Sequence, residues 1–368
     1  MALSVRLNSL LLTCKDCARF VDNGRWLQGL LDGFSVESML GIPSVRAFPC
    51  VMLYGSLVAG TAFQDGDADY TILFSSRAPH EELSSLEKLK LSPCNFLEVS
   101  REHHQDVLSS ILTHIKNKDA CTVLEHERIF TARVPIVRLK RKGIEEDSDW
   151  FDLSLSLDGL RNSLLLRLYM ESDPRLRAGA LCAKRWGRLQ KILGARRGWI
   201  SPYALTVMYI FYMQSTGRSC CVINEGQVDK LLEVVAAQSS DDYSLNCSRF
   251  YETIPCVDVN VSEVLSDLHG FFRFFGDFRE FDFDVDVVDI RTRNKYHSKE
   301  RWLEAMRGFS EKERWDLLGY ELLMLRDPYE PHNLGRSVDF FHAEIVRETF
   351  RLASERSTED LRDLLQME

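Results

Sequence analysis

Short apolar runs separated by turn signals fill the first part of the chain. Residues 48–54 and 69–74 form two such runs, and strand character returns at 129–139 and 150–157. Residues 80–128 are polar and mostly helical in their spacing. This order predicts a mixed sheet with helices packed on it.

Helical spacing dominates from about residue 160 onward. Asp173 before Pro174 and Ser201 before Pro202 are typical helix starts, and the first of these helices is expected to run to Gly194. We therefore predict a second, mainly helical domain. Its further helical patterns lie at 226–237, 261–275, 299–308 and 337–354, with a strand-like stretch at 281–292.

The N-terminal residues also have helical spacing, with an interruption at Asn23-Gly24. We expect this segment to pack on the second domain. A chain of 368 residues is long enough for two domains with sizeable cores. The predicted organisation is a helical segment at 1–40, an α/β domain at 41–158 with a possible insertion at 80–128, and a helical domain at 159–368.

Composition narrows the possible function classes only a little. Hydrophobic residues make up 45% of the chain, and no apolar run approaches the roughly 18 residues of a membrane span, so we expect a soluble protein. The formal net charge is -9, so nucleic-acid binding would depend on local basic segments. Two such segments exist, at 138–142 and 184–197, and a solvated face explains either of them equally well.

The ten cysteines include one lone C-x-x-C, Cys14 and Cys17, without a second pair at zinc-ligand spacing. We predict no structural zinc and reduced thiols in an intracellular compartment. The first fifteen residues contain two basic residues, several Ser and Thr, and no acid, which is typical of a mitochondrial transit peptide. An ordinary amphipathic helix explains them equally well.

Paired carboxylates follow the first strand. Asp67 and Asp69 are two residues apart at the start of a strand, so both side chains point to one face, and Asp152 lies in a later strand. Such a set suits Mg²⁺, and two ions about 3.5 to 4 Å apart can stabilise both oxygens of an in-line displacement. Upstream, Gly55 permits close approach of a triphosphate and Ser56 can donate to a phosphate oxygen.

A second acidic stretch has no such Gly-Ser partner upstream. Asp282, Asp284 and Asp286 alternate along the strand-like segment. Because a lone D-x-D pattern has low specificity, we interpret these three residues as a solvated strand face.

With these motifs, the chain resembles the polymerase β-type nucleotidyltransferases, whose signature is Gly-Ser, paired aspartates and a third aspartate on a later strand. The resemblance covers about residues 45–340. It is closest to the trypanosomatid terminal uridylyltransferases. In its compact size, the chain is most similar to the mitochondrial, editosome-associated members of that group. Further segments that look like RNA-tailing enzymes are 132–137, Asn162-Ser163, 201–205, 327–330 and 332–336.

The resemblance implies an α+β fold. A polymerase β-type catalytic domain with a mixed sheet and helices would be followed by a mainly helical, poly(A) polymerase-like domain. The nucleotide would bind in the cleft between them.

Site roles follow residue by residue from the same resemblance. Asp67 and Asp69 would hold the metals, and Asp152 would complete the site and help to deprotonate the RNA 3′ hydroxyl. Asn162 would contact the ribose 2′ hydroxyl and Ser163 a phosphate. For Asn162 the alternative is a helix cap after Asp158-Gly159.

The second domain would supply the remaining nucleotide contacts. Lys184 and Arg188 share one helical face and would bind the triphosphate, although Arg188 stands where a lysine is expected. Ser201 would belong to the same nucleotide-binding set. Tyr203 would stack on the base, or else belong to the core.

Base choice would come from the segment 327–336. Asp327 and Glu330 would accept from uracil N3–H through water, and His332 would fill the space that a purine needs. This loop is one residue shorter than in many relatives, and a turn before the last helix also explains it. Arg133 and Arg138 are candidates for RNA binding.

The resulting prediction is an RNA uridylyltransferase. It would use UTP and two Mg²⁺ ions, with Mn²⁺ as a possible substitute, to extend a single-stranded RNA 3′ end. A protein complex similar to the editosome would be its partner, and the compartment would be the mitochondrion. The alternatives are an ATP-using poly(A) polymerase of the same fold and an inactive RNA-binding scaffold.

Overall fold

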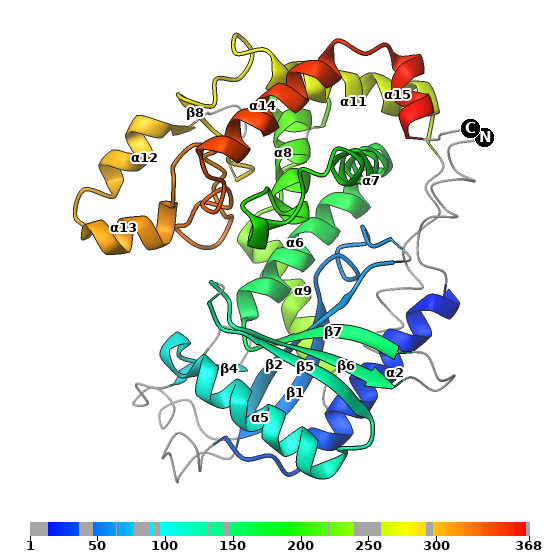
Figure 1. The fold of residues 1–368 in the computed structure, drawn as a ribbon, viewed down its shortest axis with the longest axis vertical. Helices are drawn as coiled ribbons and strands as arrows, with labels where there is room; N and C mark the ends of the chain where they lie inside the picture. Colours follow the sequence, from blue (N-terminus) through cyan, green and yellow to red (C-terminus); the bar gives the residue numbers. More distant parts are fainter. Residues whose placement is uncertain are drawn as a thin grey trace. The chain divides into compact units, whose positions relative to one another are not determined.

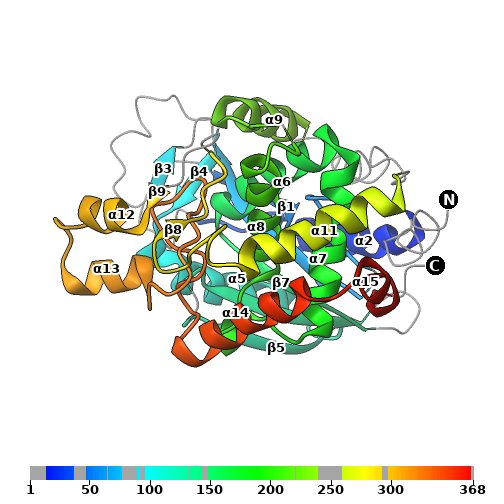
Figure 2. The same cartoon turned by 90° about the horizontal axis from the view of Figure 1, so that it is seen from above.

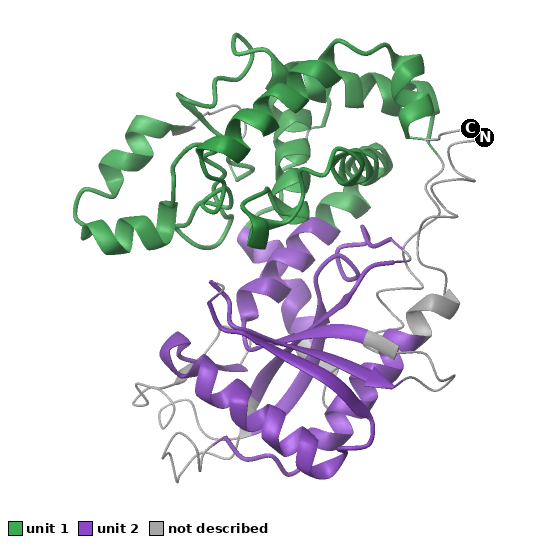
Figure 3. Cartoon of the chain, viewed as in Figure 1, with its two compact units in different colours: residues 1–10, 168–224, 256–368 green, residues 11–167, 225–255 purple. Residues whose placement is uncertain are grey.

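The computed structural model groups the chain into two compact units (Figure 3). The unit that we call the sheet unit contains 11–167 and 225–255, and the helical unit contains 1–10, 168–224 and 256–368. The division into 1–40, 41–158 and 159–368 stays a prediction, because compact units need not coincide with functional domains. The residues that the structure describes are 14–36, 47–63, 65–76, 89–91, 96–131, 133–142, 148–219, 221–238, 259–291 and 297–365.

The sheet unit is built on a mixed seven-stranded sheet (Figure 1). The strand order is β3-β4-β2-β7-β6-β5, and β1 pairs with β2. The β2–β7 pair is parallel, and the other pairs of the sheet are antiparallel. The strands are β1 Ala47–Tyr54, β2 Ala68–Ser76, β3 Leu89–Leu91, β4 Phe96–Val99, β5 Val123–Ile129, β6 Ile136–Lys142 and β7 Ser148–Ser154.

Helices α2 (Cys14–Leu31) and α5 (His104–Lys118) pack against each other and on this sheet. Tyr70 of β2 donates through its hydroxyl to the Phe20 carbonyl of α2 at 2.6 Å. Arg141 of β6 pairs with Asp22 of α2 at 2.7 Å. Because side chains alternate along a strand, the neighbouring positions of β2, β7 and β6 face away from α2 and α5.

One expectation about α2 was wrong. The helix continues through Asn23-Gly24, because the Asn23 side chain is buried and accepts from Arg141 Nη1 at 2.8 Å. The helix packs on the sheet of its own unit, and packing of the N-terminal segment on the second domain stays a prediction. Residues 1–13 of the predicted N-terminal helix lie outside the described residues.

The helical prediction for residues 80–128 was partly wrong. Helix α5 buries the predicted face, but β3, β4 and β5 of the same stretch join the sheet. These strands are short or polar, and β5 alternates little in burial, so periodicity gave no signal for them. Pairing with β6 and β2 is what orders them.

The helical unit centres on α11 (Val261–Gly276), which lies against α14 (Phe340–Ser354) in both views (Figures 1 and 2). Rings of Phe271 and Phe350 lie 5.3 Å apart, and those of Trp186 and Phe272 4.4 Å apart. Burial of such rings is the main stabilising contribution here. The other elements are α7 Pro174–Leu189, α8 Pro202–Ser215, α12 Lys299–Ala305, α13 Glu311–Leu318, α15 Thr358–Leu364, β8 Asp286–Val287 and β9 His297–Ser298. Helix α6 (Leu157–Ser172) crosses the boundary between the units, and α9 (Glu225–Gln238) belongs to the sheet unit.

The predicted helix starts are confirmed. Asp173 accepts from the Arg175 backbone at 2.9 Å, and Ser201 accepts from the Ala204 backbone at 3.0 Å. Helix α7 ends earlier than predicted, because Lys191 adopts a left-handed backbone with φ 58°.

The strand predicted at 281–292 reduces to the two residues of β8, so the interpretation of its acids as a strand face was wrong. Asp282 accepts from Asp284 N at 2.9 Å, and Asp286 accepts from Asp282 N at 2.8 Å. These carboxylates therefore cap a turn. In the described part of the chain, no helix has both the length and the apolar character needed to cross a membrane.

Candidate functional site

Four side chains lie in register across the sheet. Tyr54 pairs with Asp69, Asp69 with Asp152, and Asp152 with Arg138, through β1, β2, β7 and β6. Directly opposed residues share a face, which here is the face away from α2 and α5. The sheet itself thus places Asp69 beside Asp152.

Arg138 links the third carboxylate to this pair. Its Nη2 lies 2.9 Å from Asp67 Oδ2, and its Nε lies 2.7 Å from Asp152 Oδ1. The hydrogen bond to Asp152 raises the pKa of Arg138, and burial opposes that shift. Asp152 is 8% exposed, so its carboxylate needs such a cation nearby. The immediate partners of Arg138 are these aspartates, and its contact with RNA stays a prediction.

The three carboxylates fit a divalent cation by their chemistry. Hard oxygen ligands suit Mg²⁺, and Asp67 and Asp152 already bind one cationic group, the Arg138 guanidinium. Within the described ranges, no group of three or more His, Cys, Asp or Glu side chains is arranged to hold a metal ion. In this arrangement the Arg138 guanidinium is the cationic group that contacts both Asp67 and Asp152.

This bridge gives a stability prediction. Arg138→Met is expected to lower the free energy of unfolding of the metal-free protein by about 1–3 kcal/mol, because Asp152 keeps a largely buried charge without this partner. Lys140→Met is the control. Lys140 is on the same strand and pairs with Glu125, which is 57% exposed. Its replacement should therefore lower the free energy of unfolding by less than about 1 kcal/mol. Urea unfolding of both variants measures the difference, and equal losses would contradict the bridge.

Gly55 occupies a position that excludes a side chain. Its φ is +77°, and an added Cβ would lie 2.9 Å from Cγ of Asp69 and closer still to Oδ2. Its N–H donates to Ser163 Oγ at 2.7 Å, and Ser163 Oγ donates to the Gly159 carbonyl at 2.6 Å. A side chain at this position would therefore require the turn or the Asp69 carboxylate to move. Ser163, expected at a phosphate, has its hydroxyl engaged in holding this turn.

Other predicted residues of the sheet unit lie close by in the chain. Ser56 follows Gly55 in the turn, and its carbonyl accepts from Thr61 N at 2.9 Å. Asn162 lies in the second turn of α6, which begins at Leu157, so it is not the helix cap that we considered. Burial, and then the charge of Asp69, raises the pKa of Tyr54 well above its ordinary value. Arg133 precedes β6 and is partly buried.

Within the helical unit, α7 and α8 carry the other predicted nucleotide contacts. Lys184 is 4% exposed, whereas Arg188, one turn later, is exposed. Ser201 caps α8, which fixes the start of the helix that carries Tyr203. Burial raises the pKa of Tyr203 well above its ordinary value, and the charge of Asp327 adds to that effect. The structure therefore brings Tyr203 together with the predicted base-selecting segment.

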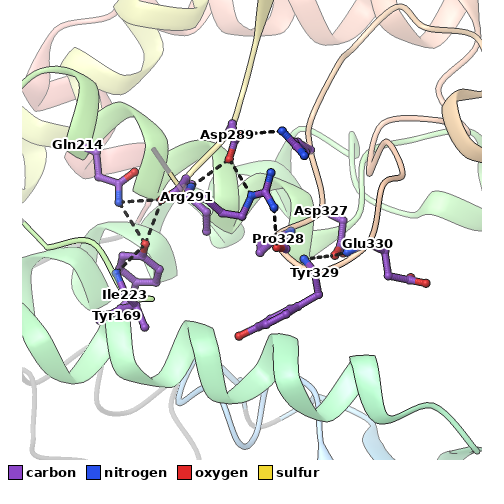
Figure 4. Close-up of polar contacts among 11 residues, drawn as sticks. Tyr169, Gln214, Ile223, Asp289, Arg291, Asp327, Pro328, Tyr329 and Glu330 are labelled. Atoms are coloured by element: carbon purple, nitrogen blue, oxygen red, sulfur yellow. Dashed lines mark hydrogen bonds and ion pairs between the residues drawn. The ribbon is translucent and has the colours of Figure 1, made fainter. Parts of the chain in front are cut away.

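The predicted segment is 327–336, and we call its first part, 327–332, the base loop. Asp327 is buried, and its Oδ1 accepts from the backbone N–H groups of Tyr329 and Glu330, each at 2.9 Å (Figure 4). His332 Nδ1 lies 3.4 Å from Glu330 Oε2, and its Nε2 lies 3.9 Å from Asp327 Oδ2. Asp327 thus shapes the turn, and Glu330 and His332 form an adjoining carboxylate–imidazole pair.

The sequence analysis included Asn333 in the base-selecting segment but assigned it no role. Asn333 is fully buried, its Oδ1 accepts from Leu325 N at 2.8 Å and Gly335 N at 2.9 Å, and its Nδ2 donates to the Leu318 carbonyl at 3.0 Å. A single polar residue in that segment gave no signal for this structural role.

Family models match both units. Residues 38–171 match the central palm domain of mitochondrial-like poly(A) RNA polymerase, and residues 266–333 match the Cid1 family poly A polymerase model. The chain is thus similar to the Cid1/GLD2-type family of poly(A) and poly(U) polymerases. Members of this family are metal-dependent nucleotidyltransferases.

Relatives in the Cid1/GLD2-type family include both kinds of polymerase. Terminal uridylyltransferase cid1 of Schizosaccharomyces pombe is 24% identical over 316 residues, which are 83% of this chain and 68% of that protein. Human poly(A) RNA polymerase GLD2 is 25% identical over 312 residues, which are 78% of this chain and 56% of GLD2. Terminal uridylyltransferase 3 of Trypanosoma brucei brucei is 39% identical, but over 67 residues, 18% of this chain and 8% of that protein. The chain thus spans about two thirds of cid1 and little more than half of GLD2.

Solved Cid1 structures have the same fold. The complex of Cid1 with the UTP analogue UMPNPP has a TM-score of 0.62 at 21% identity, covering 99% of this chain and 97% of that one. The structure of a cytoplasmic RNA terminal U-transferase has a TM-score of 0.61 at 21% identity, covering 96% of this chain and 93% of that one. The predicted α+β fold, with a polymerase β-type sheet domain and a helical poly(A) polymerase-like domain, is confirmed.

Proposed function

We propose that the chain is an RNA uridylyltransferase that adds UMP from UTP to an RNA 3′ hydroxyl without a template. The observation that supports nucleotidyl transfer is the register of Asp69 with Asp152 next to the Gly55 turn. For uridylyl specificity, the supporting observation is the Glu330–His332 pair on the base loop.

Asp67, Asp69 and Asp152 would hold two Mg²⁺ ions, which neutralise triphosphate charge and make the 3′ hydroxyl easier to deprotonate. The RNA 3′ oxygen attacks the α-phosphorus of UTP, the bond to the β-phosphate oxygen breaks, and pyrophosphate leaves. Asp152, the most buried of the three, accepts the hydroxyl proton. Arg138 then has to exchange its bonds to Asp67 and Asp152 for others, because both carboxylates take up new partners.

The remaining residues bind and orient the nucleotide. Gly55 has no side chain, so the backbone there can approach a phosphate closely, and Ser56 donates to it. Lys184 and Arg188 neutralise the outer phosphates, and Asn162 binds the ribose 2′ hydroxyl. Catalysis is then mostly positioning and charge stabilisation.

Tyr203 stacks on the base, which by itself does not distinguish bases. Glu330 accepts from uracil N3–H, directly or through water, and His332 limits the space for a purine. Adenine has no donor at the corresponding ring position, so it would give Glu330 no hydrogen bond there. ATP-dependent poly(A) addition is the second candidate function, since GLD2 matches the chain as well as cid1 does.

The test is extension of a short single-stranded RNA with Mg²⁺ and each ribonucleoside triphosphate in turn, with Asp67→Ala alongside. We expect extension by UTP and at least about a 100-fold slower rate for the variant, because Asp67 carries part of the metal charge. Extension chiefly by ATP would contradict the role of Glu330 and His332 but not the carboxylate site. No extension by any nucleotide would favour a partner-dependent enzyme or a scaffold.

We further propose a mitochondrial enzyme within an editosome-like protein complex. The support is the transit-peptide composition of the first fifteen residues and the local similarity to the trypanosome uridylyltransferase. Import of the full chain into isolated mitochondria tests the compartment, and co-purification of the tagged chain tests the complex.

A further inference from the structure

A buried carboxylate outside the predicted metal set lies behind the base loop. Asp289 is fully buried, and its Oδ1 accepts from the backbone N–H of Arg291 at 3.0 Å. The guanidinium groups of Arg291 and Arg326 approach the same carboxylate at 3.4 and 3.3 Å. Burying a carboxylate is costly unless it is paired, and these contacts supply that pairing for Asp289.

Both arginines connect Asp289 to the base loop. Arg291 Nη1 donates to the Pro328 carbonyl at 3.4 Å, and Pro328 lies between Asp327 and Tyr329 (Figure 4). Arg326 immediately precedes Asp327 in the chain. The carboxylate is thus tied to the loop through a side chain and also through the backbone.

The segment that carries Asp289 is itself held firmly. Arg326 N donates to the Val288 carbonyl at 2.9 Å, next to Asp289. On the other side, the Ile290 carbonyl accepts from Tyr169 Oη at 3.2 Å and Gln214 Nε2 at 3.3 Å. Tyr169 and Gln214 come from α6 and α8, so two long helices fix the position of Asp289.

The arrangement also contains a repulsion that Asp289 offsets. Burial, and then the positive charge of Arg291, lowers the pKa of Arg326. Two guanidinium groups beside one loop stay together because a carboxylate lies between them. Without that charge, we expect Arg291 to turn outward and release the Pro328 carbonyl.

We propose that Asp289 is a positioning residue for base selection. Through Arg291 and Arg326 it holds the base loop where Glu330 and His332 discriminate between nucleobases. The inference rests on the proposed function, because it assigns base choice to this loop. Hydrogen-bond discrimination requires placement within about 0.5 Å, so a loosened loop binds the preferred base less well and rejects others less well.

The experiment compares Asp289→Asn with the native chain. Asparagine keeps the size and can still accept from Arg291 N–H, but it removes the charge that holds the guanidinium groups. We expect KM for the preferred nucleotide to rise about 10-fold, with less than about a 3-fold change in kcat, and the UTP-to-ATP preference to fall about 10-fold. Arg291→Met should reproduce the effect, and Arg291→Lys should restore part of the preference.

Asp284→Asn is the matched control. Asp284 is in the same acidic stretch and pairs with Arg347 at 2.8 Å, but its side chain is 67% exposed. Its removal should leave KM and preference unchanged. An equal loss of UTP and ATP use in Asp289→Asn, with preference retained, would overturn the proposal, because that result indicates only lost stability.

The design separates this proposal from the proposed function. If the native chain prefers ATP, uridylyl specificity is wrong, and loss of the ATP preference in Asp289→Asn still supports the positioning role. If no nucleotide is incorporated, the same comparison is made on the dissociation constants of UTP and ATP. An unchanged ratio of UTP to ATP preference or affinity in Asp289→Asn would overturn the role of Asp289.

Discussion

The Asp69→Asn protein is expected to add nucleotides at least about 1000-fold more slowly than the native chain. Asp69 stands between Tyr54 and Asp152 in the sheet and contacts the Gly55 turn, so it is at the centre of the carboxylate set. Asparagine keeps the shape but removes the charge that a metal and a triphosphate require. Single-turnover extension of RNA at saturating nucleotide measures the loss.

The control for this prediction is Asp106→Asn, an exposed aspartate in the first turn of α5 in the same unit. Its activity should stay within about 2-fold of the native value, since it is remote in sequence and lies on the helix that packs on the opposite face. The melting temperature of Asp69→Asn should remain near the native value or increase, because one negative charge in a crowded acidic site is lost. A variant that folds and retains a tenth of native activity would exclude Asp69 as a metal ligand.

Gly55→Ala is expected to lower activity by about 100-fold or more and to cost more stability than backbone strain alone explains. Alanine in a left-handed conformation costs about 1–2 kcal/mol. At Gly55 the new methyl group would also overlap the Asp69 carboxylate, so the turn or Asp69 has to move.

Gly33→Ala is the control that measures the backbone cost alone. Gly33 has the same φ of +77° at the end of α2, and an added Cβ there meets nothing within 4 Å. Both variants therefore share the backbone cost, and the difference between them in urea unfolding and in RNA extension reports the contact with Asp69. Equal stability and activity in the two variants would show that the Gly55 turn accommodates a side chain.

The order of strands and helices was predictable where local signals are strong. Helices α7 and α8 start at Asp173 and Ser201 as expected, since a cap followed by proline acts within a few residues. Polar strands such as β5 were not predictable, because their conformation depends on pairing with a neighbour. The same holds for α2, which continues through Asn23-Gly24 because Arg141 reaches Asn23 from β6.

The same distinction between local and long-range signals applies to the candidate site. Spacing on one strand is enough to place Asp67 and Asp69 near each other, and their residue types predict a hard cation. The bridge by Arg138 depends on the register of β6 with β7, and the support of the base loop by Asp289 depends on contacts between segments far apart in sequence. Neither has a periodic or motif signal.

By itself, the sequence determined the prediction of metal-dependent nucleotidyl transfer, because the Gly-Ser pair, the paired aspartates and the later aspartate are visible in residue types and spacing alone. Only the tertiary structure decided which polar residues act on those groups. Ser163 holds the Gly55 turn, Arg138 neutralises the aspartates, and Asp289 supports the base loop. The physical reason is that a buried charge or donor must find its partner in three dimensions, and that partner can come from any segment of the chain.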